Sequence, residues 1–457
     1  MRMDTVTIIG AGLAGSEAAW QLAVRGVAVE LVEMRPERMT PAHETGGFAE
    51  LVCSNSLKSD DPSTAAGLLK RELEALGSLV LAAARATAVP AGAALAVDRI
   101  RFSELITKIV GTHPLVTVTH HEADSIPDGD VIVATGPLTS AALEPALSEL
   151  IGESRLAFFD AAAPIVDAET IDQSRVFAAS RWEKGGGQDY LNCALTRDEY
   201  ARLISELVSA DRAPLHAFER SQLFQACQPV EEIARTGVDA LRFGALKPVG
   251  LVDPATGERP YAVVQLRPEN RDALAYNLVG FQTNLTFPEQ RRVFRLIPGL
   301  AEAEFLRYGV MHRNTYIDAP RLLTNGLALR EVPRVRIAGQ LSGTEGYLEA
   351  AASGLVAALD VWSSRTGATG LGLPPTTALG ALVRYATDPA TDPYQPMHVN
   401  FGLVPPLSQP VRGKRARYAA YAERAARDLA DTLADRGDLL IQSPTGALVD
   451  ASPGRAR

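Results

Sequence analysis

Short runs of apolar and β-branched residues near the beginning of the chain predict strands of a buried parallel sheet. Residues 5–9, TVTII, form one such run and end at a glycine, and residues 27–33, VAVELVE, form another. The segment between them, 13–26, has the pattern of a helix that ends at Gly26. Strand, glycine turn, helix and strand in this order predict a βαβ unit.

Two later segments show the same pattern of an apolar strand that runs into a glycine turn. Residues 129–137 read GDVIVATGP, and residues 334–343 read RVRIAGQLSG. After the second segment, residues 346–362 predict a helix rich in small residues, which can pack close to a backbone or a ligand. We therefore expect one parallel sheet whose strands come from both ends of the chain.

The middle of the chain, residues 176–319, has a different pattern of apolar and polar residues. Alternating apolar and polar positions at 261–266 and 276–282 predict antiparallel strands, and the segments around them are rich in glycine and proline. We expect an inserted α+β domain at 176–319, within a discontinuous domain made of residues 1–175 and 320–457. The last residues, 443–457, are expected to form a loose tail.

Composition describes an ordinary globular protein. The chain has 457 residues, of which 46% are hydrophobic and 22% charged, enough for two domains with separate cores. A net charge of −9 means that any nucleic-acid contact needs a local basic patch. Without a signal-peptide pattern or a long apolar run, we expect a cytoplasmic protein with no membrane segment. Three scattered cysteines argue against a disulfide framework, and the lack of a CxxC pair argues against a metal site.

A GxGxxG motif opens the first predicted helix. Because it follows a strand, and because Glu33 ends the next strand, the motif is typical of a dinucleotide-binding site. Gly10 permits the tight turn, Gly12 lets the backbone approach a pyrophosphate, and Glu33 can accept hydrogen bonds from a ribose 2′-hydroxyl. The residues of the motif are Gly10, Ala11, Gly12, Leu13, Ala14 and Gly15.

The two later glycine turns favour FAD over NAD as the dinucleotide. Thr135 and Gly136 lie in the first turn, and Gly339 and Gln340 lie in the second, which also brings another helix N-terminus towards the flavin end. This layout resembles FAD proteins of the glutathione-reductase type. The expected fold class is therefore α/β, a Rossmann-type FAD-binding domain that carries an inserted α+β domain.

Longer motifs resemble those of the TrmFO family of folate- and FAD-dependent tRNA (uracil-5-)-methyltransferases, and they cover nearly the whole chain. The related GidA (MnmG) family, which also modifies tRNA uridines, shares the first motif, but its chains are much longer and end in a helical extension. The motifs are GAGLAGSEAAWQLA, EMRPERMTPAH, ELVCSNSLKS, YLNC, FQACQPVEE, KPVGL, YGVMHRNTYIDAP and GTEGYLEAAASG.

The resemblance implies methylation of C5 of the T-loop uridine of tRNA, which makes ribothymidine. The carbon would come from methylenetetrahydrofolate, reduced FAD would carry it and supply electrons, and NADH or NADPH would reduce the flavin. tRNA is then the partner, and no obligate protein partner is expected. Two alternatives stay open: a GidA-like component of a wobble-uridine-modifying complex, and a small-molecule FAD oxidoreductase with a redox thiol pair.

The chemistry requires a thiol, because uracil C5 becomes nucleophilic only after a thiolate adds to C6. Cys227, in a polar segment, is the candidate nucleophile, and the resemblance assigns it the same role. The resemblance places Cys53 near the flavin, where it assists at C5, and Lys58 would favour its thiolate if the fold brings the two together. Cys193 follows an apolar run and is expected to fill a core.

Further residues are candidates for contacts with folate or RNA. Tyr347 offers an aromatic face to the flavin, and His312, Arg313 and Asn314 offer polar groups beside it. Arg313 can pair with the folate glutamate or an RNA phosphate, and an inter-domain salt bridge is its alternative role. Lys247, in the KPVGL motif, is a similar candidate.

Two basic clusters are candidate surfaces for tRNA, although either one alone is also compatible with an ordinary solvated face. One cluster consists of Arg291, Arg292 and Arg295. The other lies on a predicted helix within 410–430 and interleaves two tyrosines. Its residues are Arg412, Lys414, Arg415, Arg417, Tyr418, Tyr421, Arg424 and Arg427.

Overall fold

The computed structural model describes most of the chain. The backbone alone is described in 155–161 and 311–315. The described residues are 5–152, 155–161, 163–184, 186–213, 228–269, 272–309, 311–368, 370–392, 394–441, 444 and 446–448.

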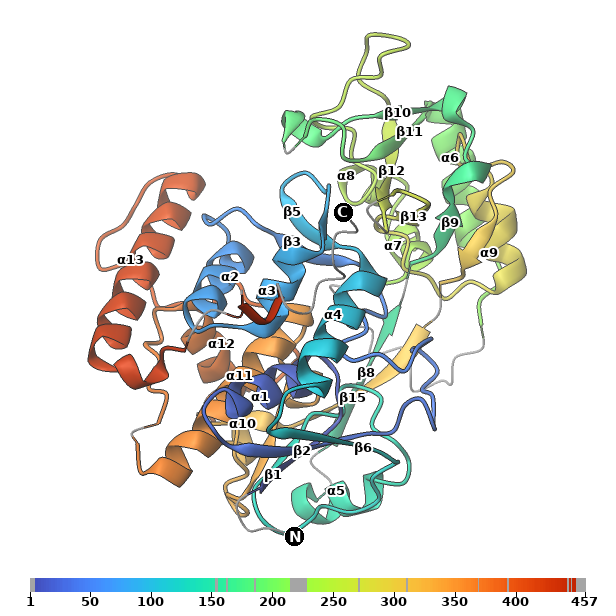
Figure 1. The fold of residues 1–457 in the computed structure, drawn as a ribbon. Helices are drawn as coiled ribbons and strands as arrows, with labels where there is room; N and C mark the ends of the chain where they lie inside the picture. Colours follow the sequence, from blue (N-terminus) through green and yellow to red (C-terminus); the bar gives the residue numbers. More distant parts are fainter. Residues whose placement is uncertain are drawn as a thin grey trace, which may run out of the picture.

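A five-stranded parallel sheet lies at one end of the molecule (Figure 1). Its order is β16-β7-β1-β2-β6, and all four neighbouring pairs are parallel. The expected sheet is therefore confirmed, including the strand that joins from beyond the middle of the chain, whereas β6 was not anticipated. The strands are β1 (Thr5–Ile9), β2 (Ala28–Glu33), β6 (Val116–His120), β7 (Val131–Val133) and β16 (Val335–Ile337).

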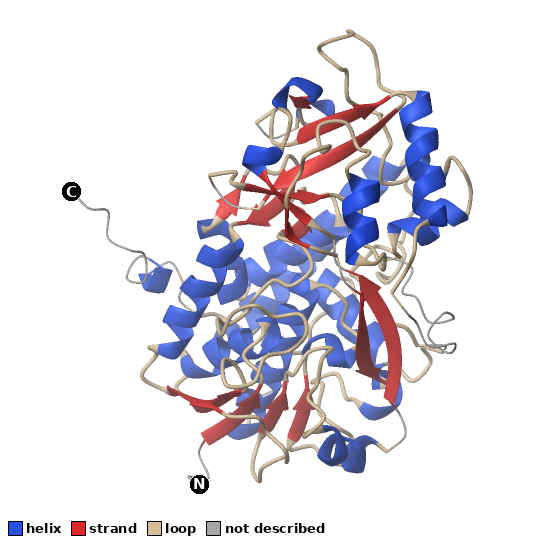
Figure 2. Ribbon diagram, turned by 90° about the vertical axis from the view of Figure 1, so that its right-hand side faces the viewer, coloured by secondary structure: helices blue, strands red, loops and turns tan. Residues whose placement is uncertain are grey.

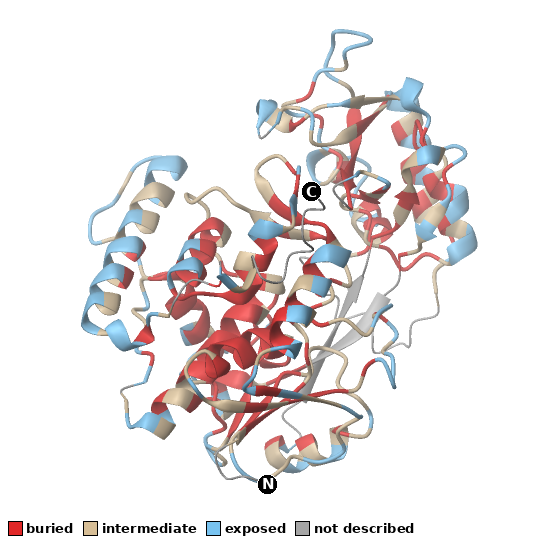
Figure 3. Cartoon of the chain, viewed as in Figure 1, coloured by how far each residue is buried: buried red, intermediate tan, exposed pale blue. Residues whose placement is uncertain are grey.

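Two helices rich in small residues, α1 (Leu13–Ala23) and α11 (Tyr347–Thr366), pack tightly against each other beside this sheet. Every residue of α1 is buried, and the pair lies within the buried centre seen in Figure 3. Gly354 of α11 lies directly on the backbone of α1, since an added Cβ would come within 2.1 Å of the Ala14 carbonyl oxygen. A glycine is required at this position because no side chain fits between the two helices.

Helix α1 ends before the glycine that was expected to cap it. Val24 is the C-cap residue and donates its backbone N–H to the Trp20 carbonyl. Gly26, with φ of +80°, lies in the turn that follows and leads into β2. The glycine therefore serves the reversal of the chain and not the helix end itself.

Further helices and a small sheet complete this part of the molecule. The small sheet has the order β3-β5-β4 and consists of β3 (Ser56–Ser59), β4 (Ala88–Val89) and β5 (Ala94–Val97). Helix α13 lies on the outside of the molecule in Figure 1, as its pattern predicts. The helices are α2 (Ala65–Ala75), α3 (Leu79–Ala86), α4 (Arg99–Gly111), α5 (Glu144–Ile151), α10 (Ala319–Leu322), α12 (Ala378–Thr387) and α13 (Lys414–Asp435), with 3₁₀ turns η6 (Gly339–Ser342) and η7 (Gly437–Leu439).

A six-stranded antiparallel sheet with the order β10-β11-β12-β13-β9-β14 forms the other end of the molecule (Figure 2). The antiparallel strands expected in the middle of the chain are confirmed as β12 and β13. Its strands are β9 (Ile165–Asp167), β10 (Val176–Ala178), β11 (Leu191–Leu195), β12 (Ala262–Pro268), β13 (Ala275–Leu278) and β14 (Phe305–Arg307). Its helices are α6 (Arg197–Ser209), α7 (Val230–Arg235), α8 (Ala240–Phe243) and α9 (Phe287–Phe294), with 3₁₀ turns η1 (Ala168–Thr170), η2 (Gln173–Arg175) and η3 (Arg181–Glu183).

An antiparallel ribbon of β8 (Arg155–Ala161) and β15 (Met311–Ile317) connects the two parts. Strand β9 lies inside the six-stranded sheet, although it precedes the boundary expected at residue 176. We propose that the inserted domain runs from the end of β8 to the beginning of β15. This division keeps the whole six-stranded sheet in one domain. The loose tail expected at residues 443–457 lies largely outside the described residues.

Substitution of Gly354 by alanine should lower the free energy of unfolding by about 1–3 kcal/mol, because the new Cβ overlaps the backbone of α1. A lowered thermal midpoint would show this. Gly111→Ala is the matched control: Gly111 ends α4, and a Cβ there meets no atom within 4 Å. The control should keep or slightly raise the midpoint. Equal midpoints for Gly354→Ala and the wild type would contradict the close contact of α1 and α11.

Candidate active site

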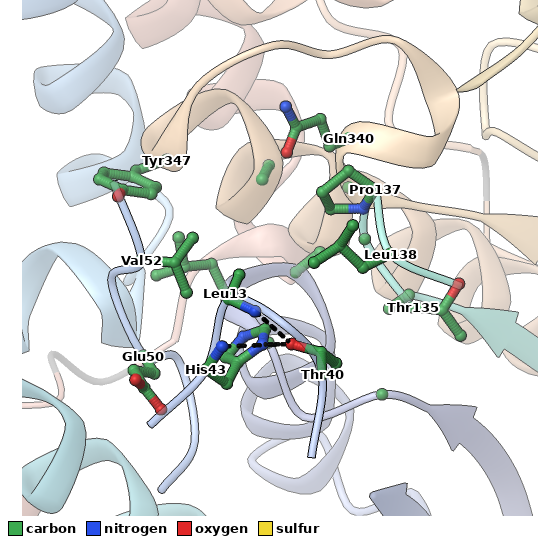
Figure 4. Close-up of a pocket in the computed structure, with 18 of the residues that line it drawn as sticks. Leu13, Thr40, His43, Glu50, Val52, Thr135, Pro137, Leu138, Gln340 and Tyr347 are labelled. Atoms are coloured by element: carbon green, nitrogen blue, oxygen red, sulfur yellow. Dashed lines mark hydrogen bonds between the residues drawn. The ribbon is translucent and has the colours of Figure 1, made fainter. Parts of the chain in front are cut away.

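A cavity of about 410 Å³ lies at the carboxyl ends of four strands of the parallel sheet. Its lining includes residues at the ends of β1 and β2 and in the turns after β7 and β16. Ligands of open α/β sheets bind at this edge, because the loops that follow the strands converge there. The close-up in Figure 4 shows part of the lining.

The glycine motif brings the backbone of α1 to the edge of the cavity. Gly10 has φ of +101°, and a Cβ on it would lie 2.6 Å from the Ala134 carbonyl oxygen. A Cβ on Gly15 would lie 1.8 Å from the Gly10 carbonyl oxygen. These two glycines allow turn, helix and β7 to pack closely. Gly12, the N-cap of α1, lines the cavity, and a Cβ on it would meet nothing within 4 Å. Open space beside free helix N–H groups suits a pyrophosphate.

Glu33 lines the same cavity, and its carboxylate accepts hydrogen bonds from the turn after β1 and from Arg35. Its Oε2 accepts the Ala11 backbone N–H at 2.7 Å, and its Oε1 accepts from the Arg35 side chain Nε at 2.8 Å and the Arg35 backbone N–H at 3.0 Å. Burial alone would raise the pKa of Glu33, but the hydrogen bonds and charge of Arg35 hold it below its ordinary value. A carboxylate at the cavity wall can accept a hydrogen bond from a ribose hydroxyl.

Most residues expected to contact the cofactor line this one cavity. The exceptions are Ala11 and Gly15, which lie behind it and build the turn. In the second later turn, Gln340 donates its side-chain amide to Glu345 at 2.6 Å, and the Gly339 N–H donates to the Ser353 hydroxyl at 2.6 Å. The lining members are Gly10, Gly12, Leu13, Ala14, Glu33, Thr135, Gly136, Gly339 and Gln340.

The segment after β2 contributes lining residues that the sequence analysis did not assign to the site. Thr40, His43 and Glu50 lie together in Figure 4, where the Thr40 hydroxyl bonds the His43 ring Nδ1. Burial and the charge of Arg35 lower the pKa of His43 to about 4, so the ring is neutral at neutral pH. The available signal was the density of polar residues directly after the strand that ends in Glu33.

Cys53 lines the cavity and is hydrogen-bonded to Tyr347 at the start of α11. The Tyr347 hydroxyl donates to Cys53 Sγ at 3.2 Å and accepts the backbone N–H groups of Cys53 at 2.8 Å and Ser54 at 3.0 Å. Burial raises the pKa of Tyr347 well above its ordinary value, and the Cys53 group acts in the same direction. One phenol therefore fixes both the backbone and the sulfur of this loop.

Strand β12 of the inserted domain reaches the same loop. Arg267 donates from Nε to Asn55 Oδ1 and from a terminal nitrogen to Ser54 Oγ, both at 2.7 Å. Arg99, on α4, forms an ion pair with Glu269 and donates to the Leu51 carbonyl at 2.7 Å. These contacts hold the loop of Cys53 between the two parts of the molecule.

The cations near Cys53 include residues that the sequence analysis did not name. Arg99 donates to the Leu51 carbonyl and Arg267 donates to the Ser54 hydroxyl, so they contact the loop on either side of Cys53. Lys58, which was expected to favour the thiolate, forms an ion pair with Glu349 at 2.8 Å and contacts His398 Nδ1 at 2.7 Å. Arg267 is buried and Arg99 is half-buried, so two guanidinium groups lie at the loop that carries Cys53.

The comparisons with known proteins follow this geometry. The family model described as "Glucose inhibited division protein A" matches residues 5–368. A protein of Moorella thermoacetica named methylenetetrahydrofolate–tRNA-(uracil-5-)-methyltransferase TrmFO is 56% identical, over 92% of this chain and 97% of its own. Its namesake in Desulforudis audaxviator is also 56% identical, over 95% and 99% of the two chains. The chain belongs to the TrmFO family.

A solved structure shares the architecture of this TrmFO-family chain. GidA of Aquifex aeolicus, in its form II crystal, superposes with a TM-score of 0.68 and covers 98% of this chain and 76% of its own. The two sequences are 18% identical, so this likeness shows the fold alone. The expected α/β fold class is confirmed by this match and by the parallel sheet.

Cys227, the predicted nucleophile of the TrmFO-family chain, lies outside the described residues. The segment that follows it is described: Glu231 is buried and accepts from the Thr283 hydroxyl at 2.8 Å and the Asn284 N–H at 2.7 Å. The Val230 N–H donates to the Gln282 carbonyl at 2.7 Å, and Gln282 lines the cavity. The chain just after Cys227 is thus attached to a segment that reaches the cavity.

The other candidate residues are placed in different ways. His312, Arg313 and Asn314 lie on β15, where the description covers the backbone. Lys247 is exposed after α8 and is not part of the cavity lining. Cys193 is fully buried in the core of the six-stranded sheet, as expected, and burial raises its pKa to about 12.

The two basic clusters differ in whether their charged side chains have partners within the protein or are exposed to solvent. On α9, Arg292 forms ion pairs with Glu206 and Glu289. Near it, Arg291 bonds the Tyr308 hydroxyl, and Arg295 bonds the Ala303 carbonyl. On α13 the basic residues of the first turn and those just before it are exposed, namely Arg412, Lys414, Arg415 and Arg417. The α13 cluster therefore offers charge that is available to a polyanion.

Two further expectations concern absences. Within the described residues, no group of His, Cys, Asp or Glu side chains has the arrangement of a metal site. No helix of the described part of the chain is both long and apolar enough to cross a membrane.

Glu33→Gln should weaken FAD binding by about tenfold and lower stability, since Arg35 loses its buried ionic partner. The lowered pKa of Glu33 means that its carboxylate stabilises the fold above the ordinary carboxyl pKa, and that this contribution is lost as the pH falls through the lower folded value. The thermal midpoint should therefore fall less in the variant as the pH is lowered from about 5 to about 3. Glu30→Gln, on the same strand, is the charge-matched control. An unchanged pH profile and flavin content in Glu33→Gln would contradict this role.

Proposed function

We propose that this protein is a methylenetetrahydrofolate-dependent tRNA (uracil-5-)-methyltransferase that uses FAD. The observation that carries the proposal is its 56% identity, over more than nine-tenths of its length, to relatives that bear this name. The geometry agrees with the chemistry, because a dinucleotide-type cavity and a cysteine share one site. The specific target, the T-loop uridine that becomes ribothymidine, belongs to the same proposal.

The residues present fit FAD. The open space beside Gly12 and the N-terminus of α1 would receive the pyrophosphate, and Glu33 would bind the ribose. The turns that contain Gly136 and Gly339 would enclose the flavin end, beside the start of α11. When bound, the reduced flavin would supply the carrier for the one-carbon unit and the two electrons that convert a methylene into a methyl group.

The protein residues would activate the uracil. The Cys227 thiolate would add to C6, and the electron pair displaced to C5 would form the bond to the methylene carbon. A base would then remove the C5 proton as the bond between the methylene and its carrier breaks, which leaves an exocyclic methylene at C5. Addition of hydride to that methylene would give the methyl group and expel the Cys227 thiolate, which restores the C5–C6 double bond. Cys53 is suited to receive that proton or to assist at C5, since it lines the cavity and is held there by Tyr347.

The folate, the electron donor for the flavin and the compartment complete the proposal. We assign His312, Arg313 and Asn314 to the folate, with Arg313 as partner for its glutamate carboxylates. NADH or NADPH is proposed as the source of electrons for the flavin, and the cytoplasm as the compartment. Tyr347 is proposed to contact the flavin and to position Cys53 through the hydroxyl that bonds Sγ.

The α13 cluster is the better candidate for contact with tRNA. Arg412, Lys414, Arg415 and Arg417 are exposed, although Arg424 bonds two backbone carbonyls and Arg427 pairs with Asp428. Arg292 of the α9 cluster, by contrast, forms ion pairs with two glutamates. A local surface of this kind is what an acidic protein of net charge −9 needs in order to bind a polyanion. Neither a small-molecule oxidoreductase nor a wobble-uridine component is favoured by a comparable observation.

The proposed donor can be tested with isotope-labelled compounds supplied one at a time to the reduced holoenzyme and unmodified tRNA. Label should enter ribothymidine from methylenetetrahydrofolate and not from S-adenosylmethionine. Nucleosides of bulk tRNA from a deletion strain should lack ribothymidine. Loss of a wobble-uridine modification in its place would favour the GidA-like alternative, and transfer from S-adenosylmethionine alone would refute the proposal.

Cys227→Ala should keep its flavin spectrum and lose methylation by roughly three orders of magnitude or more, because alanine cannot form the bond to C6. A tRNA that contains 5-fluorouridine should trap a covalent complex with the wild type and not with this variant. Cys53→Ala should still allow some addition at Cys227. Near-normal methylation by Cys227→Ala, or an adduct mapped to Cys53 or Cys193 by peptide mass spectrometry, would overturn the assignment.

A further inference from the structure

Trp182 is exposed on the inserted domain, although tryptophan is normally a largely buried residue. It lies in η3, the turn that follows β10, and 66% of its surface is accessible, against 6% for Trp20 in the core. The turn is the green segment after β10 in Figure 1. An exposed ring of this size is typical of a binding surface.

The ring of Trp182 is supported from one side. A Cβ added to Gly250 would lie 2.9–3.0 Å from three atoms of the indole ring, so the glycine lies beneath the ring face. The backbone N–H of Trp182 donates to the backbone carbonyl of Gly250 at 3.1 Å. Arg181 anchors the turn by donating to the Val249 carbonyl at 2.9 Å and to Gln265 at 2.8 Å. The indole is therefore held in place while two-thirds of its surface faces solvent.

Cations and apolar residues occur in the two segments that form this platform, the turn of Trp182 and the chain around Gly250. Lys184 in the same turn and Lys247 before Gly250 are both exposed. Val249 and Val252 are 42% and 59% exposed and extend the apolar area. An aromatic face with lysines beside it fits a flat ring attached to a negative charge.

Cations from the turn of Trp182 and from the basic end of α13 both act on one carboxylate, Asp61. Hydrogen bonds from Ser63 lower the pKa of Asp61, and the charges of Lys184 and Arg415 act on the same carboxyl in the same direction. Both cations therefore lie near Asp61, although one comes from η3 and the other from the first turn of α13. A nucleic-acid backbone that passes over the loop of Asp61 can therefore meet cations from both segments.

We propose that Trp182 stacks on an unpaired base of the tRNA substrate while Lys184 and the first turn of α13 contact the phosphates. The inference rests on the proposed function and names a contact for it. Loops of RNA expose unstacked bases, and stacking on an aromatic ring tolerates any base, since every base has a π face. Specificity for the target uridine then comes from the cavity, and Trp182 contributes affinity and orientation.

The test compares the flavin-loaded wild type with Trp182→Leu and Trp182→Phe. Trp182→Leu should raise the Kd for unmodified tRNA about tenfold. Trp182→Phe should retain most of the affinity because it keeps an aromatic face. Phe287→Leu is the matched control: Phe287 is 51% exposed beside the arginines of α9 and stacks on Tyr308. This control should bind tRNA like the wild type. Flavin content and thermal midpoint should be equal in all four proteins.

Tryptophan fluorescence gives a second readout that a purely structural role would not produce. Binding of tRNA should quench emission from the exposed Trp182 in the wild type, because a stacked base is in direct contact with the ring. In Trp182→Phe the quenching should largely disappear although binding persists. Substitution of Lys414, Arg415 and Arg417 together by glutamine should weaken binding and reduce its salt dependence.

The outcomes separate this inference from the proposed function. If the wild type methylates tRNA and Trp182→Leu binds it equally well, the stacking proposal is overturned and the function stands. If Phe287→Leu alone lost tRNA binding, the tRNA-binding surface would have to lie at α9 and not at Trp182. Dimers of the wild type that become monomers in Trp182→Leu, with unchanged tRNA affinity, would make the platform a protein interface. A wild type that binds no tRNA would contradict both proposals.

Discussion

The close contact of backbones around α1 is the constraint on which the site depends. Gly10 and Gly15 let the first turn, the helix and β7 approach within van der Waals distance, and Gly354 lets α11 lie directly on α1. Because of this packing, the N-termini of both helices reach one cavity at the edge of the parallel sheet. A single methyl group at these positions would separate the elements that form the cofactor site.

A second layer of interactions joins the cavity to the inserted domain. Tyr347, at the start of α11, holds the backbone and sulfur of Cys53, while Arg267 of β12 holds the neighbouring Ser54 and Asn55. The loop that carries the thiol is thus positioned by both domains. The position of the Cys53 thiol therefore depends on how β12 and its sheet pack against the rest of the molecule.

Charge is distributed in a way that suits a large polyanionic substrate. The protein is acidic as a whole, so its repulsion of RNA has to be overcome locally. The arginines of α9 are committed to glutamates or to local hydrogen bonds, whereas the cations at the start of α13 are exposed near Lys184 and the Trp182 platform. The exposed cations at the start of α13 and the cavity at the sheet edge therefore lie on separate parts of the molecule.

The sequence alone determined the parallel sheet, the cofactor motif with Glu33 and the cysteine in the polar loop, because these features depend on local periodicity and short spacings. It could not identify Arg267 or Arg99 as neighbours of Cys53, since Arg267 and Asn55 are 212 residues apart and meet only in the folded chain. The same limit applies to His43, which shows no periodic pattern, and to the two basic clusters, which look alike in sequence. Only the tertiary structure shows how those clusters differ, because the fold brings Glu206 to Arg292 and leaves Arg415 exposed.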